Sequence, residues 1–325
     1  MARRYRFRQV DVFTDQPLAG NPLAVFPTAD GLSDREMQAI AREMNLSETT
    51  FVLPVTPAGA AGGATYRMRI FTPRVELPFA GHPSVGTAWV LAEEGAFPLT
   101  GAVTEVRQEI TIGVLPLAIE ASGGRPGAVT MTQGAPEVRA ALPPDELIAL
   151  AEALAVPVEA LGWTDADGTV HDGRRVPPRV VTTGLPYLVV PFRDRGALAG
   201  VSSDRNAAAS AVARRHGCDS VALVAPGSAG AITDADVHAR VLVDPAVGIQ
   251  EDPATGSAAG PIAVYLGVLG GAQDEVRHLV IEQGVEIGRP SRLDVKAAFY
   301  SDGQPRSVRL TGRTVPVLAG TLELP

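Results

Sequence analysis

The 325-residue chain has few of the side chains that form disulfides or structural metal sites. It contains one cysteine, Cys218, and one lysine, Lys296. One thiol excludes an intramolecular disulfide framework and is too few for a structural zinc site, which indicates a reducing compartment. No apolar run approaches the length of a membrane span, and strand-like residues follow the basic first residues where a secretion signal would have an apolar core. We therefore expect a cytoplasmic protein.

The sequence also lacks a basic patch, and its net charge is -8. Nucleic acids and anionic membrane surfaces bind basic patches, so neither is expected as a partner. P-loop, nucleophile-elbow and dinucleotide motifs are missing as well. His171, His216, His238 and His278 have no metal-ligand spacing, so no metal site is expected. A hydrophobic content of 46% over this length is enough for two domains, each with its own core.

One short sequence pattern occurs twice in the chain, at residues 76–84 and 251–259. In register, each copy runs from Glu through Pro and Gly into an apolar stretch, and an Arg-containing segment precedes each. The recurrence predicts a duplicated domain whose halves each have a short strand, a Pro/Gly turn and an apolar helix. Such a helix start leaves N–H groups unpaired and carries partial positive charge, so two of them could hold one acidic substrate.

Hydrophobic patterning predicts more strands than helices in both halves. A capping box of Ser33 with Glu36 begins a helix that ends near Asn45. We expect further helices at residues 144–154 and 205–215, and strands at residues 5–13, 23–26, 62–71, 103–119, 180–190, 220–224, 236–243 and 279–285. The Gly/Pro-rich segment 122–127 is the best linker candidate. This predicts an N-terminal domain of residues 1–126, onto which the last strand, about 314–325, packs back. A C-terminal domain of residues 127–313 would be its pseudo-repeat.

Glu48 and His82 are candidate proton carriers. Glu48 lies between two hydroxyl residues where a helix gives way to an apolar strand, and a carboxylate partly desolvated there would have a raised pKa and could carry a proton. The alternative is an exposed loop glutamate, which these residues alone favour. His82 lies in a Gly/Pro turn at a helix start, where it either hydrogen bonds to substrate and moves a proton or caps the helix.

Asp252 and Ser257 lie in the second copy of the turn. Beside Pro and Gly they read as ordinary turn and cap residues. The recurrence of the whole turn weakens that interpretation, because a cap alone does not require it.

Taken together, these stretches resemble the PhzF-like (phenazine biosynthesis) family, within the diaminopimelate epimerase-like fold. The matching stretches follow the family order and span nearly the whole chain: DVF at 11–13, GNPLAV at 20–25, NLSETTF at 45–51, FTP at 71–73, AGHP at 80–83, EDPATGSA at 251–258, QG at 283–284 and GRPS at 288–291. The resemblance implies an α+β fold of two similar domains. Each would be a mixed sheet or barrel curled around a central helix, with the active site in the cleft between them.

The resemblance also implies an activity: cofactor-independent isomerisation of a small unsaturated carboxylic acid, in which Glu48 shuttles a proton between carbons. Asp252 and His82 match the family's other catalytic positions. Gly81, Gly256, Ser257, Thr255 and Asn21 are the expected substrate-binding residues. The partner implied is a small acidic substrate, and the fold's frequent homodimers favour a homodimer here.

Two-thiol epimerases of this fold have a Cys immediately before the turn glycine of each domain, and those positions here are Ala80 and Thr255. Inversion at a carbon needs one group to remove a proton and another to deliver it to the opposite face. Allylic isomerisation by one carboxylate therefore fits better than racemisation. Two alternatives stay open: an epimerase that uses Glu48 and Asp252 as opposed carboxylates, and a non-catalytic binder of small acids.

Overall fold

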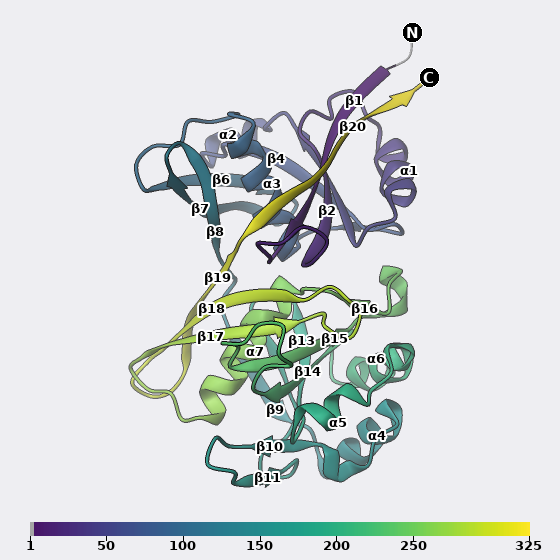
Figure 1. The fold of residues 1–325 in the computed structure, drawn as a ribbon, viewed down its shortest axis with the longest axis vertical. Helices are drawn as coiled ribbons and strands as arrows, with labels where there is room; N and C mark the ends of the chain where they lie inside the picture. The colour runs from purple at the N-terminus through teal and green to yellow at the C-terminus, as the bar shows by residue number, and fades with distance from the viewer. Residues whose placement is uncertain (1–2) are drawn as a thin grey trace. The chain divides into compact units, whose positions relative to one another are not determined.

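The structure, a computed structural model, describes residues 3–325 and divides the chain into two compact units (Figure 1). Unit 1 contains the chain up to Thr132 together with Thr311–Pro325, and unit 2 is Gln133–Leu310. Within residues 3–325 no helix combines the length and the hydropathy needed to cross a membrane.

Unit 1 is a mixed sheet around one helix. Its helices are α1 (Asp34–Met44), α2 (Pro57–Ala61) and α3 (Gly81–Glu93), and its strands are β1 (Arg3–Val12), β2 (Asn21–Phe26), β3 (Glu48–Leu53), β4 (Tyr66–Phe71), β5 (Glu76–Leu77), β6 (Val103–Ile110), β7 (Gly113–Ser122), β8 (Arg125–Thr132) and β20 (Thr314–Leu324). Pairing runs in the order β20, β1, β2, β3, β4, β6, β7, β8, with β5 paired to β4. The β2–β3 and β4–β6 pairs are parallel and the others are antiparallel. The last strand, β20, pairs with β1 along its whole length.

Helix α3 is the centre of unit 1, because every residue from Gly81 to Ala92 is buried. A helix that is apolar on all sides has no solvent face and belongs inside a core. Gly86 allows the sheet to approach closely, since a Cβ at this position would lie 2.7 Å from side-chain atoms of both Leu23 and Val12.

Unit 2 has the same plan around helix α7 (Gly256–Leu269), in which every residue from Gly256 to Tyr265 is buried. Its other helices are α4 (Pro144–Leu154), α5 (Arg195–Ala199) and α6 (Asn206–Arg215), with three 3-10 turns at Val158–Ala160, Ser203–Arg205 and Pro245–Val247. Its strands are β9 (Glu137–Ala141), β10 (Gly162–Thr164), β11 (Val170–Asp172), β12 (Arg179–Thr182), β13 (Pro186–Pro191), β14 (Ser220–Pro226), β15 (Val237–Leu242), β16 (Glu251–Asp252), β17 (Val276–Gln283) and β18 (Ser291–Phe299). Strand β19 (Pro305–Gly312) runs from unit 2 into unit 1.

Strand pairing confirms that the two units are similar. In unit 1 the series β1, β2, β3, β4, β6, β7 pairs antiparallel, parallel, antiparallel, parallel and antiparallel. The series β12, β13, β14, β15, β17, β18 repeats that alternation in unit 2. In each unit a two-residue strand, β5 or β16, then leads into the central helix. The expected α+β fold with two similar domains is therefore present.

Several local features differ from the sequence expectation. The linker candidate at 122–127 is the turn of the β7–β8 hairpin inside unit 1, where Gly123 and Gly124 have φ values of 59° and 76°. Two consecutive left-handed residues are what a tight hairpin turn requires. The chain passes from unit 1 to unit 2 after Thr132 and returns after Leu310. The strand expected at 62–71 begins only at Tyr66, because a short helix capped by Thr56 precedes it.

A paired arginine and glutamate precede the central helix in each unit. Arg69 of β4 binds Glu76 of β5 through both carboxylate oxygens, at 2.7 and 2.6 Å. Arg240 of β15 binds Glu251 of β16 in the same way, at 3.0 and 2.6 Å. The side chains of the first pair are 18% and 32% exposed, whereas those of the second are 3% and 2% exposed. Water therefore screens the charges of the second pair much less than those of the first.

This difference predicts unequal costs for the same substitution. Arg240→Met leaves the buried Glu251 carboxylate without its balancing charge and is expected to lower the free energy of unfolding by about 3–5 kcal/mol. The matched variant Arg69→Met, at the more exposed pair, is expected to cost about 1 kcal/mol. Urea denaturation measures both. Adding Glu251→Leu to Arg240→Met should restore most of the loss, and equal costs for the two single variants would contradict this account.

Candidate functional site

Glu48 is positioned by the parallel β2–α1–β3 connection of unit 1. Helix α1 ends at Asn45, whose φ of 51° and ψ of 38° turn the chain sharply, and β3 begins three residues later. Glu48 is the first residue of β3 and pairs with Leu23 of β2. Asn21, the first residue of β2, is fully buried. Both candidate residues thus lie at the same end of this parallel pair.

His82 is the second residue of α3, and its side chain faces Glu48. The His82 Nε2 atom lies 3.3 Å from Glu48 Oε2, and the two side chains are 4% and 13% exposed respectively. Glu48 is therefore not an exposed loop residue. The structure brings these two sequence-predicted residues together within unit 1, and Gly81 adjoins them at the helix start.

Burial lowers the pKa of His82 to about 3. Taking a charged imidazolium out of water is unfavourable, so the neutral ring is favoured at this position. At neutral pH the contact with Glu48 therefore joins a carboxyl group to an uncharged imidazole that carries one N–H donor and one acceptor nitrogen. Such a ring can orient the carboxyl group without neutralising a negative charge on it.

The second cluster of predicted residues lies in unit 2, in the turn between β16 and α7. The Thr255 hydroxyl donates to Asp252 Oδ2 at 2.6 Å. Gln283 holds both ends of the turn: its Nε2 donates to the Asp252 carbonyl at 2.7 Å, and its Oε1 accepts from the Thr255 N–H at 3.0 Å. Asp252 is 8% exposed. The sequence places Gln283 in an expected strand and in a stretch that resembles the family, but its contact with a turn about 30 residues earlier appears only after folding.

Ser257 is the second residue of α7 and so has the place in unit 2 that His82 has in unit 1. Its hydroxyl lies 2.7 Å from the hydroxyl of Tyr187 on β13. Sequence reasoning missed Tyr187, because within a predicted strand it is an ordinary aromatic residue. Gln133 was also missed: its Nε2 donates to the carbonyl of Gly256 at 2.7 Å.

The cysteine lies outside both clusters. Cys218 follows α6 and is buried, and its thiol donates a hydrogen bond to the Ala213 carbonyl oxygen at 3.5 Å. Burial raises the pKa of its thiol to about 11. The thiol is therefore protonated at neutral pH, and it is not a counterpart of the thiols that two-thiol epimerases have before the turn glycines.

Residues 10–320 match the family model described as phenazine biosynthesis-like protein, PhzC-PhzF. The chain belongs to this family. Among curated relatives, the trans-2,3-dihydro-3-hydroxyanthranilate isomerase of Pseudomonas aeruginosa is 38% identical over 301 residues, which cover 90% of each chain. That of Pseudomonas chlororaphis is 37% identical over 321 residues, covering 97% of this chain and 98% of the relative. This PhzC-PhzF protein is an isomerase.

Solved structures agree with the fold. A PhzF family protein of Bacillus anthracis superposes with a TM-score of 0.82 at 26% identity, covering 98% of this chain and 99% of that one. A probable proline racemase from Agrobacterium radiobacter superposes with a TM-score of 0.62 at 14% identity, covering 99% and 93%. The second likeness concerns the fold alone. It confirms the diaminopimelate epimerase-like architecture expected for a PhzC-PhzF protein.

The burial of His82 predicts that its ring does not titrate between pH 5 and pH 8. In ¹⁵N-detected NMR spectra its nitrogen shifts should stay those of a neutral imidazole across that range, and they should be assigned by comparison with His82→Asn. The folded pKa of about 3 lies below the ordinary 6.5, so the associated stability is complete above pH 6.5 and is lost as the pH falls toward 3. A titration midpoint near 6.5 would contradict the buried neutral ring.

Gly284, next to Gln283, predicts a second measurable effect. Its φ is +80°, and a Cβ there would lie 2.5 Å from the Pro253 carbonyl oxygen. Gly284→Ala should therefore displace the turn that holds Asp252. Gly288→Ala is the matched control, because Gly288 has a φ of +70° but no atoms within 4 Å of a Cβ. The control should cost about 1 kcal/mol of backbone strain, and Gly284→Ala should cost at least about twice that in urea denaturation. Equal costs would rule out the steric account.

Proposed function

We propose that this PhzC-PhzF protein moves a proton within a small unsaturated carboxylic acid, with Glu48 as the group that carries it. The observation that supports this most directly is the 3.3 Å contact between His82, which is buried, and Glu48, whose side chain is 13% exposed. A carboxyl group shielded from water and oriented by a neutral ring is suited to take up a proton and return it.

In the proposed reaction, Glu48 removes a proton from an allylic carbon and becomes a carboxylic acid. The electron pair of the broken C–H bond enters the conjugated system, and the double bond shifts. Glu48 then returns the same proton to a carbon further along that system. Atoms and electrons balance within one substrate molecule, so the step needs no electron acceptor. The start of α3, next to His82, offers unpaired N–H groups and positive dipole to the developing negative charge.

For the unit 2 cluster we propose hydrogen bonding to the acid, by Asp252, Thr255 and Ser257, with Gly81, Gly256 and Asn21 as further binding positions. Asp252 Oδ2 already accepts from Thr255, which favours an orienting role over a second proton carrier. Because the positions before the turn glycines carry no thiol, transfer along one face by one carboxyl group is the simpler mechanism.

Trans-2,3-dihydro-3-hydroxyanthranilate, which gives the curated relatives their name, is the first substrate to test. It should be incubated with the full chain in D₂O and followed by NMR. Glu48→Gln is expected to lower turnover and deuterium incorporation by at least about a hundredfold, because the amide cannot accept the proton. Glu43→Gln, an exposed residue at the end of α1, is the matched control and should leave both unchanged.

The same experiment separates the alternatives. Full turnover by Glu48→Gln would remove the proposed role. Exchange at a stereocentre with racemised product, abolished equally by Glu48→Gln and Asp252→Asn, would select an epimerase with two carboxylates. Tight binding of the acid with no exchange by the unaltered protein would select a non-catalytic binder.

A further inference from the structure

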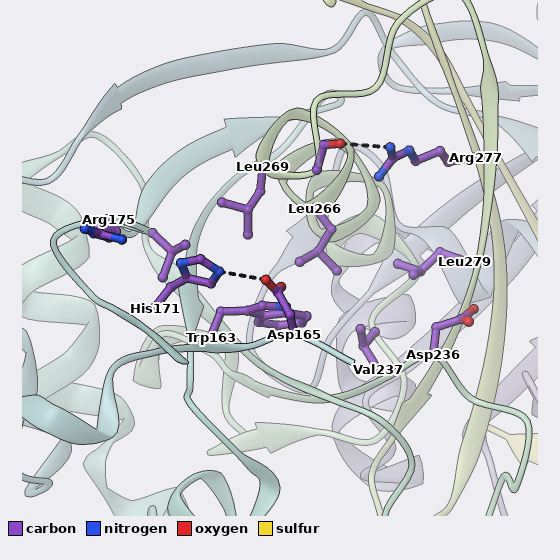
Figure 2. Close-up of a pocket in the computed structure, with 12 residues that line it drawn as sticks. Trp163, Asp165, His171, Arg175, Asp236, Val237, Leu266, Leu269, Arg277 and Leu279 are labelled. Atoms are coloured by element: carbon purple, nitrogen blue, oxygen red, sulfur yellow. Dashed lines mark hydrogen bonds and ion pairs between the residues drawn. The ribbon is translucent and has the colours of Figure 1, made fainter. Parts of the chain in front are cut away.

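A cavity of about 630 Å³ lies in unit 2 at the far end of α7 from Ser257 (Figure 2). Side chains from the last turn of α7, from the β10–β11 hairpin and its flanks, and from the ends of β15 and β17 line it. Helix α7 rises about 20 Å over its length, so this cavity and the turn at Ser257 are different places. Its volume falls in the range of small-molecule sites.

The walls of the cavity combine apolar side chains with charged ones. Leu266 and Leu269 project from α7 toward the indole ring of Trp163 on β10, and Leu279 and Val237 close another side (Figure 2). A flat or branched hydrocarbon body between the leucines and the indole would bury apolar surface on both of its faces.

Two hydrogen-bond donors at this cavity have no protein acceptor. Across residues 3–325, neither the exposed Arg175 guanidinium nor the indole N–H of the partly exposed Trp163 hydrogen bonds with another protein group, although both residues line the cavity. One oxygen of each acid beside them is engaged: Asp165 Oδ2 lies 2.7 Å from His171 Nε2, and Asp236 Oδ2 accepts from the Val280 N–H at 2.8 Å. The cavity therefore offers two donors, beside two carboxylates that each already bind a protein group through one oxygen.

The partial negative charge at the C-terminal end of α7 is offset by hydrogen bonds, so it does not exclude an anion from the cavity. A helix C-terminus carries partial negative charge on its last carbonyl groups. Here the Gly270 N–H donates to the Leu266 carbonyl at 2.9 Å, and Arg277 Nη2 donates to the Gly270 carbonyl at 3.0 Å. These bonds offset that charge at the cavity wall.

We propose that this cavity is a second ligand site, which binds a small carboxylic acid with an aromatic or branched apolar body. The carboxylate would accept from Arg175, since a guanidinium matches its two oxygens, and the body would lie between Trp163 and the leucines of α7. The site is independent of the function proposed for Glu48.

The test is calorimetric titration of the full chain with 3-phenylpropionate, with 3-phenylpropionamide as the uncharged probe. We expect a dissociation constant of about 1 mM or tighter for the acid, and weakening by at least about tenfold in Arg175→Gln or with the amide. Arg174→Gln is the matched control, because Arg174 is exposed, as Arg175 is, but does not line the cavity. It should bind as the unaltered protein does.

Glu48→Gln shows which site the acid occupies. Unchanged affinity in this variant, together with a loss in Arg175→Gln and in Trp163→Leu, supports the second site. No heat of binding up to about 10 mM of the acid overturns the proposal. Equal losses in Arg174→Gln and Arg175→Gln overturn it too, because they would reflect surface charge alone, and so does a loss in Glu48→Gln.

Discussion

The central constraint on this PhzC-PhzF protein is that each unit encloses a helix with almost no solvent face. Because each helix is buried on all sides, the side chains of its first turn are buried too. His82 and Ser257 are the second residues of the two helices and are 3% and 9% exposed. The loss of water at this position lowers the pKa of His82 and makes a neutral imidazole available beside Glu48.

Duplication has kept the framework and changed the chemistry. Both units keep the alternation of parallel and antiparallel pairs, and each has an Arg–Glu pair before its central helix. At the second residue of the helix, however, unit 1 has His82 facing Glu48, whereas unit 2 has Ser257 bonded to Tyr187. The unit 1 position thus pairs a carboxyl group with a neutral imidazole, and the unit 2 position pairs two hydroxyl groups. The framework is therefore repeated, while the side chains at the start of the central helix differ between the two units.

Unit 2 contains a group of buried ionisable side chains next to the turn that carries Asp252. Arg240 and Glu251 are almost fully buried, and His238 lies between Glu282 at 3.0 Å and Glu286 at 2.8 Å. The charges of Arg240 and Glu251 offset each other, and the His238 ring hydrogen bonds with the other two carboxyl groups, which is how buried ionisable groups are accommodated in a core. They fix β15, β16 and β17 around the turn that carries Asp252. The two ends of α7 also differ: the start forms hydrogen bonds with Gln133 and Tyr187, while the far end faces a cavity lined by both apolar and charged side chains.

The sequence by itself determined the features that depend on residues close together along the chain. The capping box at Ser33 and the apolar periodicity of α4 are short-range signals, and the helices appear at those places. The repeated turn gave the two-domain plan. Only the tertiary structure decided that Glu48 lies against His82 and that Gln283 and Tyr187 hold the unit 2 cluster. Those contacts join residues about 30 to 70 positions apart, and burial depends on which surfaces the folded chain brings together, which no local pattern contains.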